Sequence, residues 1–291
     1  TVTGLTGVGR TYDRTTDATA TGTATLSGVV SPDEVSLGGT PVFTFGSIHV
    51  GTAVTIGTTG YTLGGTGAGN YTLTQPTLAA DITAKTLTVT GLVGDAKVYD
   101  GTTAATASGT ADLDGIISGD TVTLAGTPVF TFGSRHVDPA VTIATTGYEL
   151  AGADAGDYAL TQPTLSAAIT PKTITITGLT GRTKVYDGTT TATTTGAASL
   201  VGVVSGDAVT LVGTPSFAFA SPGVGSGVAI TASGFTISGA EAGDYQVTQP
   251  SGLSAAITAR PITVTASDQA KVYGARSEEH TSELQSLAYL V

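Results

Sequence analysis

One short motif returns at a fixed distance along this chain, and that distance constrains the fold more than any other feature. Lys97–Thr103 reads KVYDGTT, Lys184–Thr190 repeats it unchanged, and a divergent copy, RTYDRTT, stands at Arg10–Thr16. A fourth copy begins as KVYG, so that the motif tyrosines recur every 87 residues, at positions 12, 99, 186 and 273. This step is longer than the 20–50 residues of common solenoid units. It therefore predicts tandem small domains, each with a core of its own.

The repeat reads as an all-β unit. Residues 86–90 (TLTVT) alternate apolar and hydroxyl side chains with period two, as a half-buried strand does, and residues 121–124 and 130–132 alternate in the same way. Turn residues recur roughly every ten positions, and no stretch has helical periodicity. The pattern predicts about seven short strands per repeat, which is typical of an Ig-like β-sandwich.

Three local motifs give further expectations. Asp100-Gly101 predicts a tight hairpin turn, and Arg14 in place of the glycine puts the same turn of the first copy in doubt. Two phenylalanines per copy, such as Phe130 and Phe132, are expected at the centre of each core. The stretch before Tyr158 (ADAGDY) is similar to the tyrosine corner of immunoglobulin-like domains, in which the hydroxyl bonds to backbone just upstream.

The period also sets the expected domain boundaries. Repeat 1 covers residues 1–84 and is expected to be truncated at its N-terminus. Repeat 2 covers 85–171, repeat 3 covers 172–258, and residues 259–275 are the first strands of a truncated fourth repeat. The joins contain no Gly/Ser-rich spacer, and Pro171 and Pro261 stiffen two of them. We therefore expect successive domains to meet in fixed orientations and to form a rod.

The last residues do not follow the sequence pattern of the repeats. Residues 276–291 (RSEEHTSELQSLAYLV) resemble a sequencing-library adapter read as protein, and we expect them to be a non-native tail on a fragment of a longer reading frame.

Composition excludes several functional classes. The net charge is −11 with only 11 Lys and Arg, which disfavours nucleic acids and anionic membrane surfaces as partners. The absence of cysteine removes disulfides and thiolate metal sites. No apolar run is long enough to span a bilayer, so membrane insertion is not expected.

No residue of the chain is assigned a catalytic, cofactor-binding or metal-binding role, and we expect no enzyme activity and no cofactor. His49 and His136 occupy equivalent positions, but Gly223 replaces them in repeat 3, and we interpret the histidines as solvated loop residues. Calcium would need six to eight converging oxygens. The candidate carboxylates match no known calcium loop, and turn chemistry explains them better: they are Asp112, Asp114, Asp120, Asp154 and Asp157. A covalent cross-link from the side chain of Lys97 or Lys184 to an Asp or Asn is the alternative role for these lysines.

Taken together, these motifs resemble a known family. The Tyr-Asp-Gly-Thr-Thr motif and the stretch Ala155–Pro163 (AGDYALTQP) resemble the YDG-type repeats of large bacterial surface proteins, the filamentous haemagglutinin-like adhesins. Residues from 259 on are similar to the mostly-β, glycine-rich repeats with a Tyr-Gly motif.

The resemblance implies a location outside the cell or on the bacterial surface. It also implies a structural role, as stalk or spacer repeats that project a distal binding region and contact neighbouring repeats of the same chain. The alternative is a module that binds glycans or a host surface directly.

Overall fold

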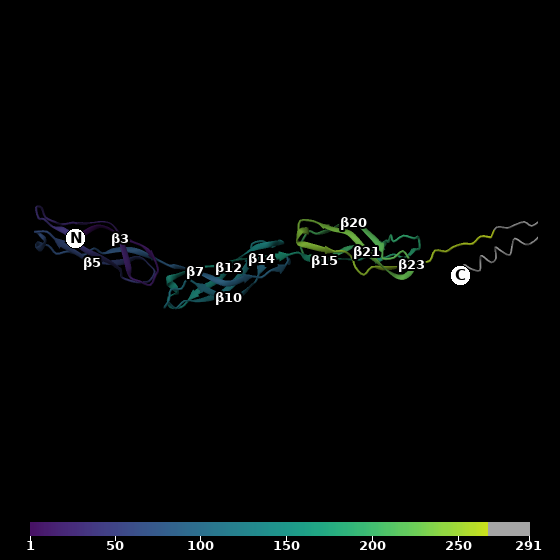
Figure 1. Cartoon of the computed structure of the whole chain (residues 1–291), viewed down its shortest axis with the longest axis horizontal. Helices are drawn as coiled ribbons and strands as arrows, with labels where there is room; N and C mark the ends of the chain where they lie inside the picture. The colour runs from purple at the N-terminus through teal and green to yellow at the C-terminus, as the bar shows by residue number, and fades with distance from the viewer. Residues whose placement is uncertain (267–291) are drawn as a thin grey trace, which may run out of the picture. The chain divides into compact units, whose positions relative to one another are not determined.

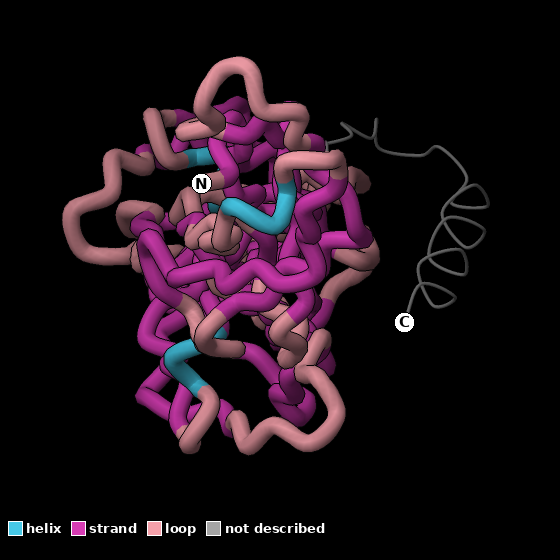
Figure 2. The backbone as a smooth tube through the Cα atoms, turned by 90° about the vertical axis from the view of Figure 1, so that its left-hand side faces the viewer, coloured by secondary structure: helices cyan, strands magenta, loops and turns pink. Residues whose placement is uncertain are grey.

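The structure is a computed structural model that describes residues 1–266, and strands make up most of it (Figure 2). The all-β prediction is confirmed: among the described residues the helices are three single 3-10 turns, η1 (Ala68–Asn70), η2 (Ala155–Asp157) and η3 (Ala242–Asp244). The chain divides into two compact units. The first comprises Thr1–Thr177, Ser199–Thr214 and Phe235–Gln249, and the second comprises Gly178–Ala198, Pro215–Gly234 and the described residues from 250 to 266.

Repeat 1 is a curled arrangement of six strands in the order β1-β3-β4-β5-β6-β2. Neighbouring strands are antiparallel except β2, which pairs in parallel with β6 at the end of the repeat. The strands are β1 (Val2–Val8), β2 (Arg10–Thr11), β3 (Asp17–Leu26), β4 (Ser36–Phe45), β5 (Gly51–Gly64) and β6 (Leu78–Thr83).

Repeat 2 has two separate sheets, a three-stranded one in the order β10-β7-β13 and a five-stranded one in the order β8-β14-β12-β11-β9. Figure 1 shows β7, β10, β12 and β14 running together along this repeat. Its strands are β7 (Lys85–Gly94), β8 (Lys97–Val98), β9 (Ala104–Ala105), β10 (Ala107–Asp114), β11 (Thr123–Phe132), β12 (Asp138–Ala151), β13 (Tyr158–Thr161) and β14 (Thr164–Thr170).

Repeat 3 contributes to both units. In the first unit β15 (Lys172–Thr177) lies between β19 (Ser199–Val201) and β22 (Tyr245–Thr248). In the second unit β16 (Thr180–Gly181) pairs with β18 (Thr194–Thr195), and β23 (Ser254–Thr258) lies between β17 (Lys184–Val185) and β21 (Gly225–Ser238). The four-stranded sheet ends with β20 (Thr210–Phe219), and the chain passes between the units within β20 and β21.

The predicted Asp-Gly hairpin is wrong. In repeat 2 the strands that flank Asp100-Gly101 do not pair with each other: β8 pairs with β14 and β9 pairs with β11, at opposite edges of the five-stranded sheet. Residues 99–103 therefore form a loop that crosses the end of that sheet. The Tyr99 N–H bonds to the Thr170 carbonyl at 2.8 Å, and the Phe132 N–H bonds to the Thr103 carbonyl at 2.8 Å, which fixes both ends of the loop.

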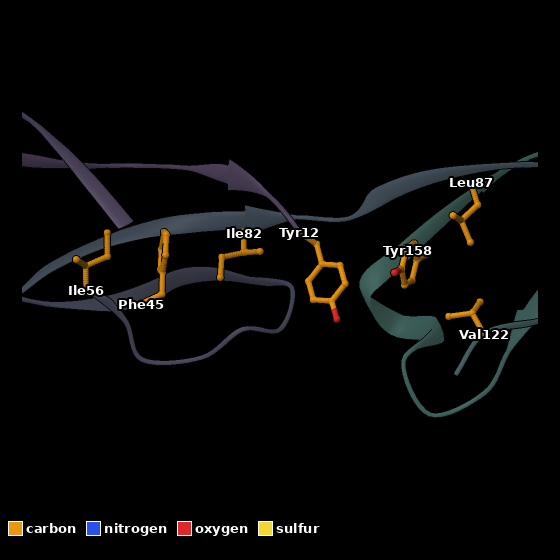
Figure 3. Close-up of a cluster of buried hydrophobic side chains, with 7 residues drawn as sticks. All are labelled: Tyr12, Phe45, Ile56, Ile82, Leu87, Val122 and Tyr158. Atoms are coloured by element: carbon orange, nitrogen blue, oxygen red, sulfur yellow. The ribbon is translucent and has the colours of Figure 1, made fainter. Parts of the chain in front are cut away.

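The second phenylalanine of each pair is buried, as predicted: Phe45, Phe132 and Phe219 are each no more than 3 % exposed. The expectation of one core per repeat, however, is wrong. Buried Tyr12, Phe45, Ile56 and Ile82 of repeat 1 form one cluster with residues of repeat 2, namely Leu87, Val122 and Tyr158 (Figure 3). The next cluster joins residues of repeats 2 and 3 in the same way. The reason is that each join carries apolar side chains into both neighbours.

Candidate functional site: the junction between repeats

A single residue separates the last strand of one repeat from the first strand of the next. Ala84 lies between β6 and β7, and Pro171 lies between β14 and β15. The incoming strand becomes the middle strand of the next three-stranded sheet, where β7 pairs in parallel with β13 and antiparallel with β10. The join is therefore part of the sheet of the following repeat, and it is not a flexible linker.

The motif tyrosine of repeat 1 is inserted into repeat 2. Tyr12 is 2 % exposed, and its hydroxyl donates to Asp120 Oδ2 at 3.0 Å, 108 residues further along the chain. Tyr158 donates to the same carboxylate oxygen at 2.6 Å. The two rings meet edge to face with centroids 5.4 Å apart, a favourable geometry for aromatic pairs. Figure 3 shows Tyr12 between Ile82 of its own repeat and Tyr158 of the next.

The junction between repeats 2 and 3 repeats this arrangement. Tyr99 is 1 % exposed and donates to Asp207 Oδ2 at 2.8 Å, and Tyr245 donates to the same oxygen at 2.5 Å. The rings again lie 5.4 Å apart at 75°. Because the same Tyr–Asp–Tyr cluster forms at both junctions, we interpret it as a regular feature of the contact between repeats.

The tyrosine-corner prediction is wrong about how far upstream the backbone partner of the tyrosine hydroxyl lies. The Tyr158 hydroxyl accepts the Ile117 N–H at 3.0 Å, which lies 41 residues upstream in another loop. The residues just before Tyr158 form η2, and this single turn aims the ring at the junction. The motif therefore joins two loops of the repeat to each other and to the preceding repeat.

Titration behaviour follows from this geometry. Burial, followed by the hydrogen bond to Asp207, raises the pKa of Tyr245 to about 12. Burial and then Asp120 raise the pKa of Tyr12 still further. Burial works to raise the pKa of Asp207, but the hydroxyls of Tyr245 and Tyr99 and the charge of Arg135 lower it overall. Near neutral pH Asp207 is thus an anionic acceptor held by two neutral hydroxyl donors.

Each buried carboxylate also faces an arginine of the preceding repeat, supplied from different sequence positions. Arg14 Nε lies 3.0 Å from Asp120 Oδ1, and Arg14 Nη1 donates to the Ser118 carbonyl at 2.7 Å. At the second junction Arg135 lies 3.6 Å from Asp207 and 3.4 Å from Glu241. Residue 14 corresponds to Gly101, and Arg14 keeps the left-handed backbone of that glycine, with φ of 67° against 80°.

The histidines are exposed loop residues, as interpreted, with side chains that are 60 % and 54 % exposed, but each also contacts a buried aspartate of the next repeat. His49 Nδ1 lies 2.8 Å from Asp157 Oδ2, and the Val50 N–H donates to the other carboxylate oxygen at 2.8 Å. His136 Nδ1 likewise lies 2.8 Å from Asp244 Oδ2, and these two residues are 108 positions apart, as His49 and Asp157 are. Asp157 is 5 % exposed and Asp244 is 4 % exposed. The hydrogen bond to Asp157 and its charge raise the pKa of His49.

The YDG loop itself is held from within. Lys97 Nζ bonds to Asp100 Oδ1 and to the Thr102 carbonyl, both at 2.8 Å, and lies 5.5 Å from the centroid of the Phe132 ring. Asp100 Oδ1 also accepts the Thr102 N–H at 2.9 Å. Burial works to raise the pKa of Asp100, but these bonds lower it to about 2. The loop is thereby fixed at the point where Tyr99 leaves the repeat. Lys97 is held here by an ion pair with Asp100.

The calcium candidates serve as hydrogen-bond acceptors and strand residues. Asp120 and Asp157 belong to the junction, Asp154 accepts the Thr121 N–H at 2.7 Å, and Asp112 accepts the Leu113 N–H at 2.9 Å. Asp114 pairs with Thr88 in the ladder of β10 with β7. Within residues 1–266 no three His, Cys, Asp or Glu side chains gather as metal ligands. Over that same range no helix has the length and apolar character needed to cross a membrane.

The sequence and this geometry agree with one comparison. A family model described as the YDG domain matches three successive segments, residues 1–78, 83–165 and 170–252. No curated protein and no solved structure matches the chain. The three matched segments cover most of the chain, and each carries one motif tyrosine, at position 12, 99 or 186. The chain belongs to the YDG domain family, as a tandem array of three such repeats.

Proposed function

We propose that these repeats are the stalk or spacer of a bacterial protein that is secreted or anchored at the cell surface, of the adhesin type, and that they project a distal binding region. The role is mechanical and not enzymatic. The proposal requires contacts between neighbouring repeats of the same chain. It places these repeats on the extracellular side.

The repeated junction is the observation that supports this proposal. A spacer must resist bending where its units join, and bending is easiest at flexible linkers. Here one residue separates the strands, and each junction buries a Tyr–Asp–Tyr cluster with an added arginine. In repeat arrays, contacts between neighbours of this kind add to the stability of each unit.

Direct binding of glycans is the alternative, and it predicts a concave site lined by aromatic or acidic side chains in one copy. Repeat 1 has a cleft of about 320 Å³ beside Thr1, whose lining mixes apolar residues such as Leu26 and Leu63 with polar ones such as Ser27 and Thr72. With Tyr71 as its one aromatic residue and no carboxylate in its lining, this cleft lacks the groups that the alternative predicts.

Small-angle X-ray scattering tests the spacer role. A series of chains carries zero, one or two extra copies of residues 85–171 inserted after Pro171. β12 has 14 residues, and a strand of that length spans roughly 45 Å. We expect the maximum dimension to grow by a constant increment of that order per added copy.

The control series carries a flexible Gly-Ser segment after each inserted copy, and its increments should be smaller and more variable. Equal growth in the two series would contradict the proposal. So would saturable binding of a defined glycan by the parent chain.

A further inference from the structure

Both junctions present the same surface to the preceding repeat. A loop supplies a serine, a glycine and a buried aspartate, and the single 3-10 turn ends in a second aspartate that a tyrosine follows directly. In repeat 2 these residues are Ser118, Gly119, Asp120, Asp157 and Tyr158, and in repeat 3 they are Ser205, Gly206, Asp207, Asp244 and Tyr245. The two sets are identical in residue type, and we call each of them the receiving surface.

The repeat ends that meet these two surfaces differ in the position of their arginine. Arg14 lies in the YDG loop of repeat 1, where repeat 2 has Gly101. Arg135 lies in the loop between β11 and β12 of repeat 2, where repeat 1 has Ile48. Each junction therefore has one arginine, from one of two positions, and neither junction has both.

Both arginines reach the same carboxylate oxygen. Arg14 Nε lies 3.0 Å from Asp120 Oδ1, and Arg135 Nη1 lies 3.6 Å from the equivalent Asp207 Oδ1. The two tyrosine hydroxyls of each junction bond to the other oxygen, Oδ2. Each aspartate side chain is 1 % exposed, and a carboxylate buried to that degree is costly without its partners. The two loops thus meet one and the same requirement.

The space that Arg14 takes at the first junction is open at the second. A Cβ on Gly119 would collide with the Arg14 guanidinium, whereas a Cβ on the equivalent Gly206 would meet no atom within 4 Å. A Cβ on Gly101 would have Val204 Cγ1 as its closest neighbour, at 2.9 Å, which is the tip of a side chain and not backbone. Arg14 also shows that an arginine adopts the positive φ of this position. An arginine at position 101 therefore has a suitable backbone and room beside Asp207.

The second carboxylate near the arginine does not prevent such an exchange. Arg135 Nη2 lies 3.4 Å from Glu241 Oε1, and repeat 2 has the shorter Asp154 at that position. Glu241 also accepts the Ala208 N–H at 2.9 Å, and Asp154 accepts the Thr121 N–H at 2.7 Å. Each of these carboxylates therefore keeps a hydrogen bond within its own repeat when the arginine comes from the YDG loop.

We propose that the receiving surface binds the end of any YDG repeat that supplies the motif tyrosine and one arginine, at either of the two positions. The partner of this surface is a class of repeat ends, and not one particular neighbour. Because each repeat of an array contacts only its neighbours, whole copies can be lost or gained while every junction stays complete. The inference concerns the contact itself and holds or fails independently of the spacer role.

An exchange of arginines at the second junction tests this in the full chain. Arg135→Ile copies the residue of repeat 1 and should raise the unfolding equilibrium constant about tenfold at a fixed urea concentration, because Asp207 loses its positive partner. Adding Gly101→Arg should restore most of that loss. Adding Gly101→Ala instead is the matched control, since it places a side chain on the same backbone without a guanidinium, and it should restore nothing.

The ionisation of Asp207 is the second readout, measured from the ¹³C signal of its carboxyl carbon. Burial acts to raise the pKa of Asp207, and the hydroxyls of Tyr245 and Tyr99 and the charge of Arg135 lower it overall. Arg135→Ile should therefore raise this pKa, and the added Gly101→Arg should lower it again. A general loss of structure would not reverse the shift in this order.

A chain that lacks residues 85–171 is the second arm, because it joins the end of repeat 1 directly to the receiving surface of repeat 3. Ala84 then connects β6 to β15 as it connects β6 to β7 in the parent chain. We expect one cooperative unfolding transition, and we expect Arg14→Gly in this shortened chain to raise its unfolding equilibrium constant about tenfold.

Three results would overturn the proposal. The first is a Gly101→Arg variant that regains no more stability than Gly101→Ala in the Arg135→Ile background. The second is a pKa of Asp207 that the exchange of arginines leaves unchanged. The third is a shortened chain that unfolds without cooperativity or that is indifferent to Arg14→Gly.

Discussion

The residue on which each junction depends is a buried aspartate. Asp120 accepts hydrogen bonds from Tyr12 and Tyr158 and pairs with Arg14, while its own side chain is 1 % exposed. A carboxylate in such a site is stabilised only by its partners, and the partners are equally dependent on it. Each junction therefore needs residues of two neighbouring repeats: the YDG tyrosine comes from one repeat and the aspartate from the next.

Asp120→Ala tests this dependence. The change leaves two buried hydroxyls without their shared acceptor, and we expect the free energy of unfolding to fall by about 3 kcal/mol. Urea unfolding followed by tyrosine fluorescence measures it, and the absence of tryptophan simplifies the signal. Asp112→Ala, an exposed carboxylate on β10, is the control and should lie within about 0.5 kcal/mol of the parent. Equal effects of the two changes would show that Asp120 has no special role.

His49 gives the first junction a pH dependence. Its pKa is raised by the bond to Asp157, with smaller contributions from the charges of Asp154 and Asp120. The stabilisation is therefore complete below the unfolded value of about 6.5 and is lost as pH rises through the folded pKa.

An NMR titration of the imidazole C–H signals checks this directly. We expect the His49 resonance to titrate above 6.5 in the parent chain and to return toward that value in Asp157→Asn. His49→Gln assigns the signal and removes this part of the pH dependence. A midpoint at or below 6.5 in the parent chain would contradict the expectation.

At the scale of the elements, the strands were predictable and their partners were not. Alternation over residues 86–90 marks β7 because one of its faces is buried, and this signal is local. The Asp-Gly signal misled because a turn residue fixes a backbone conformation and does not determine which strands its neighbours join. Gly101 adopts the predicted positive φ, yet β8 and β9 lie at opposite sheet edges.

The junction was beyond the reach of a single sequence for a related reason. His49 and Asp157 are 108 residues apart, so that the partner lies one repeat and a further loop away. No local pattern joins residues at that distance.

At the scale of the whole molecule, the boundaries of the buried clusters do not coincide with the boundaries of the sequence repeats. The buried clusters straddle the joins, with Tyr12 and Leu87 in one and Tyr99 and Ile174 in the next. The boundary between the compact units correspondingly falls inside repeat 3, away from its joins. Repeat 2 therefore holds two half-clusters, each completed by a neighbouring repeat, whereas the third cluster lies wholly within repeat 3. Arrays of this kind gain stability from interfaces as well as from the units themselves.

This offset predicts how stability depends on where the chain is cut. Residues 85–171 alone lose Tyr12, Ile82, Ile174 and Tyr245 from their two clusters. Each of these buried side chains contributes about 1.5–3 kcal/mol, a sum comparable to the whole stability of a small domain. We expect the isolated copy to unfold at a much lower urea concentration than the 1–171 chain, and the 1–258 chain to be more resistant than either. If the isolated copy unfolds at the same midpoint as the array, each repeat is an independent domain and the junctions contribute orientation alone.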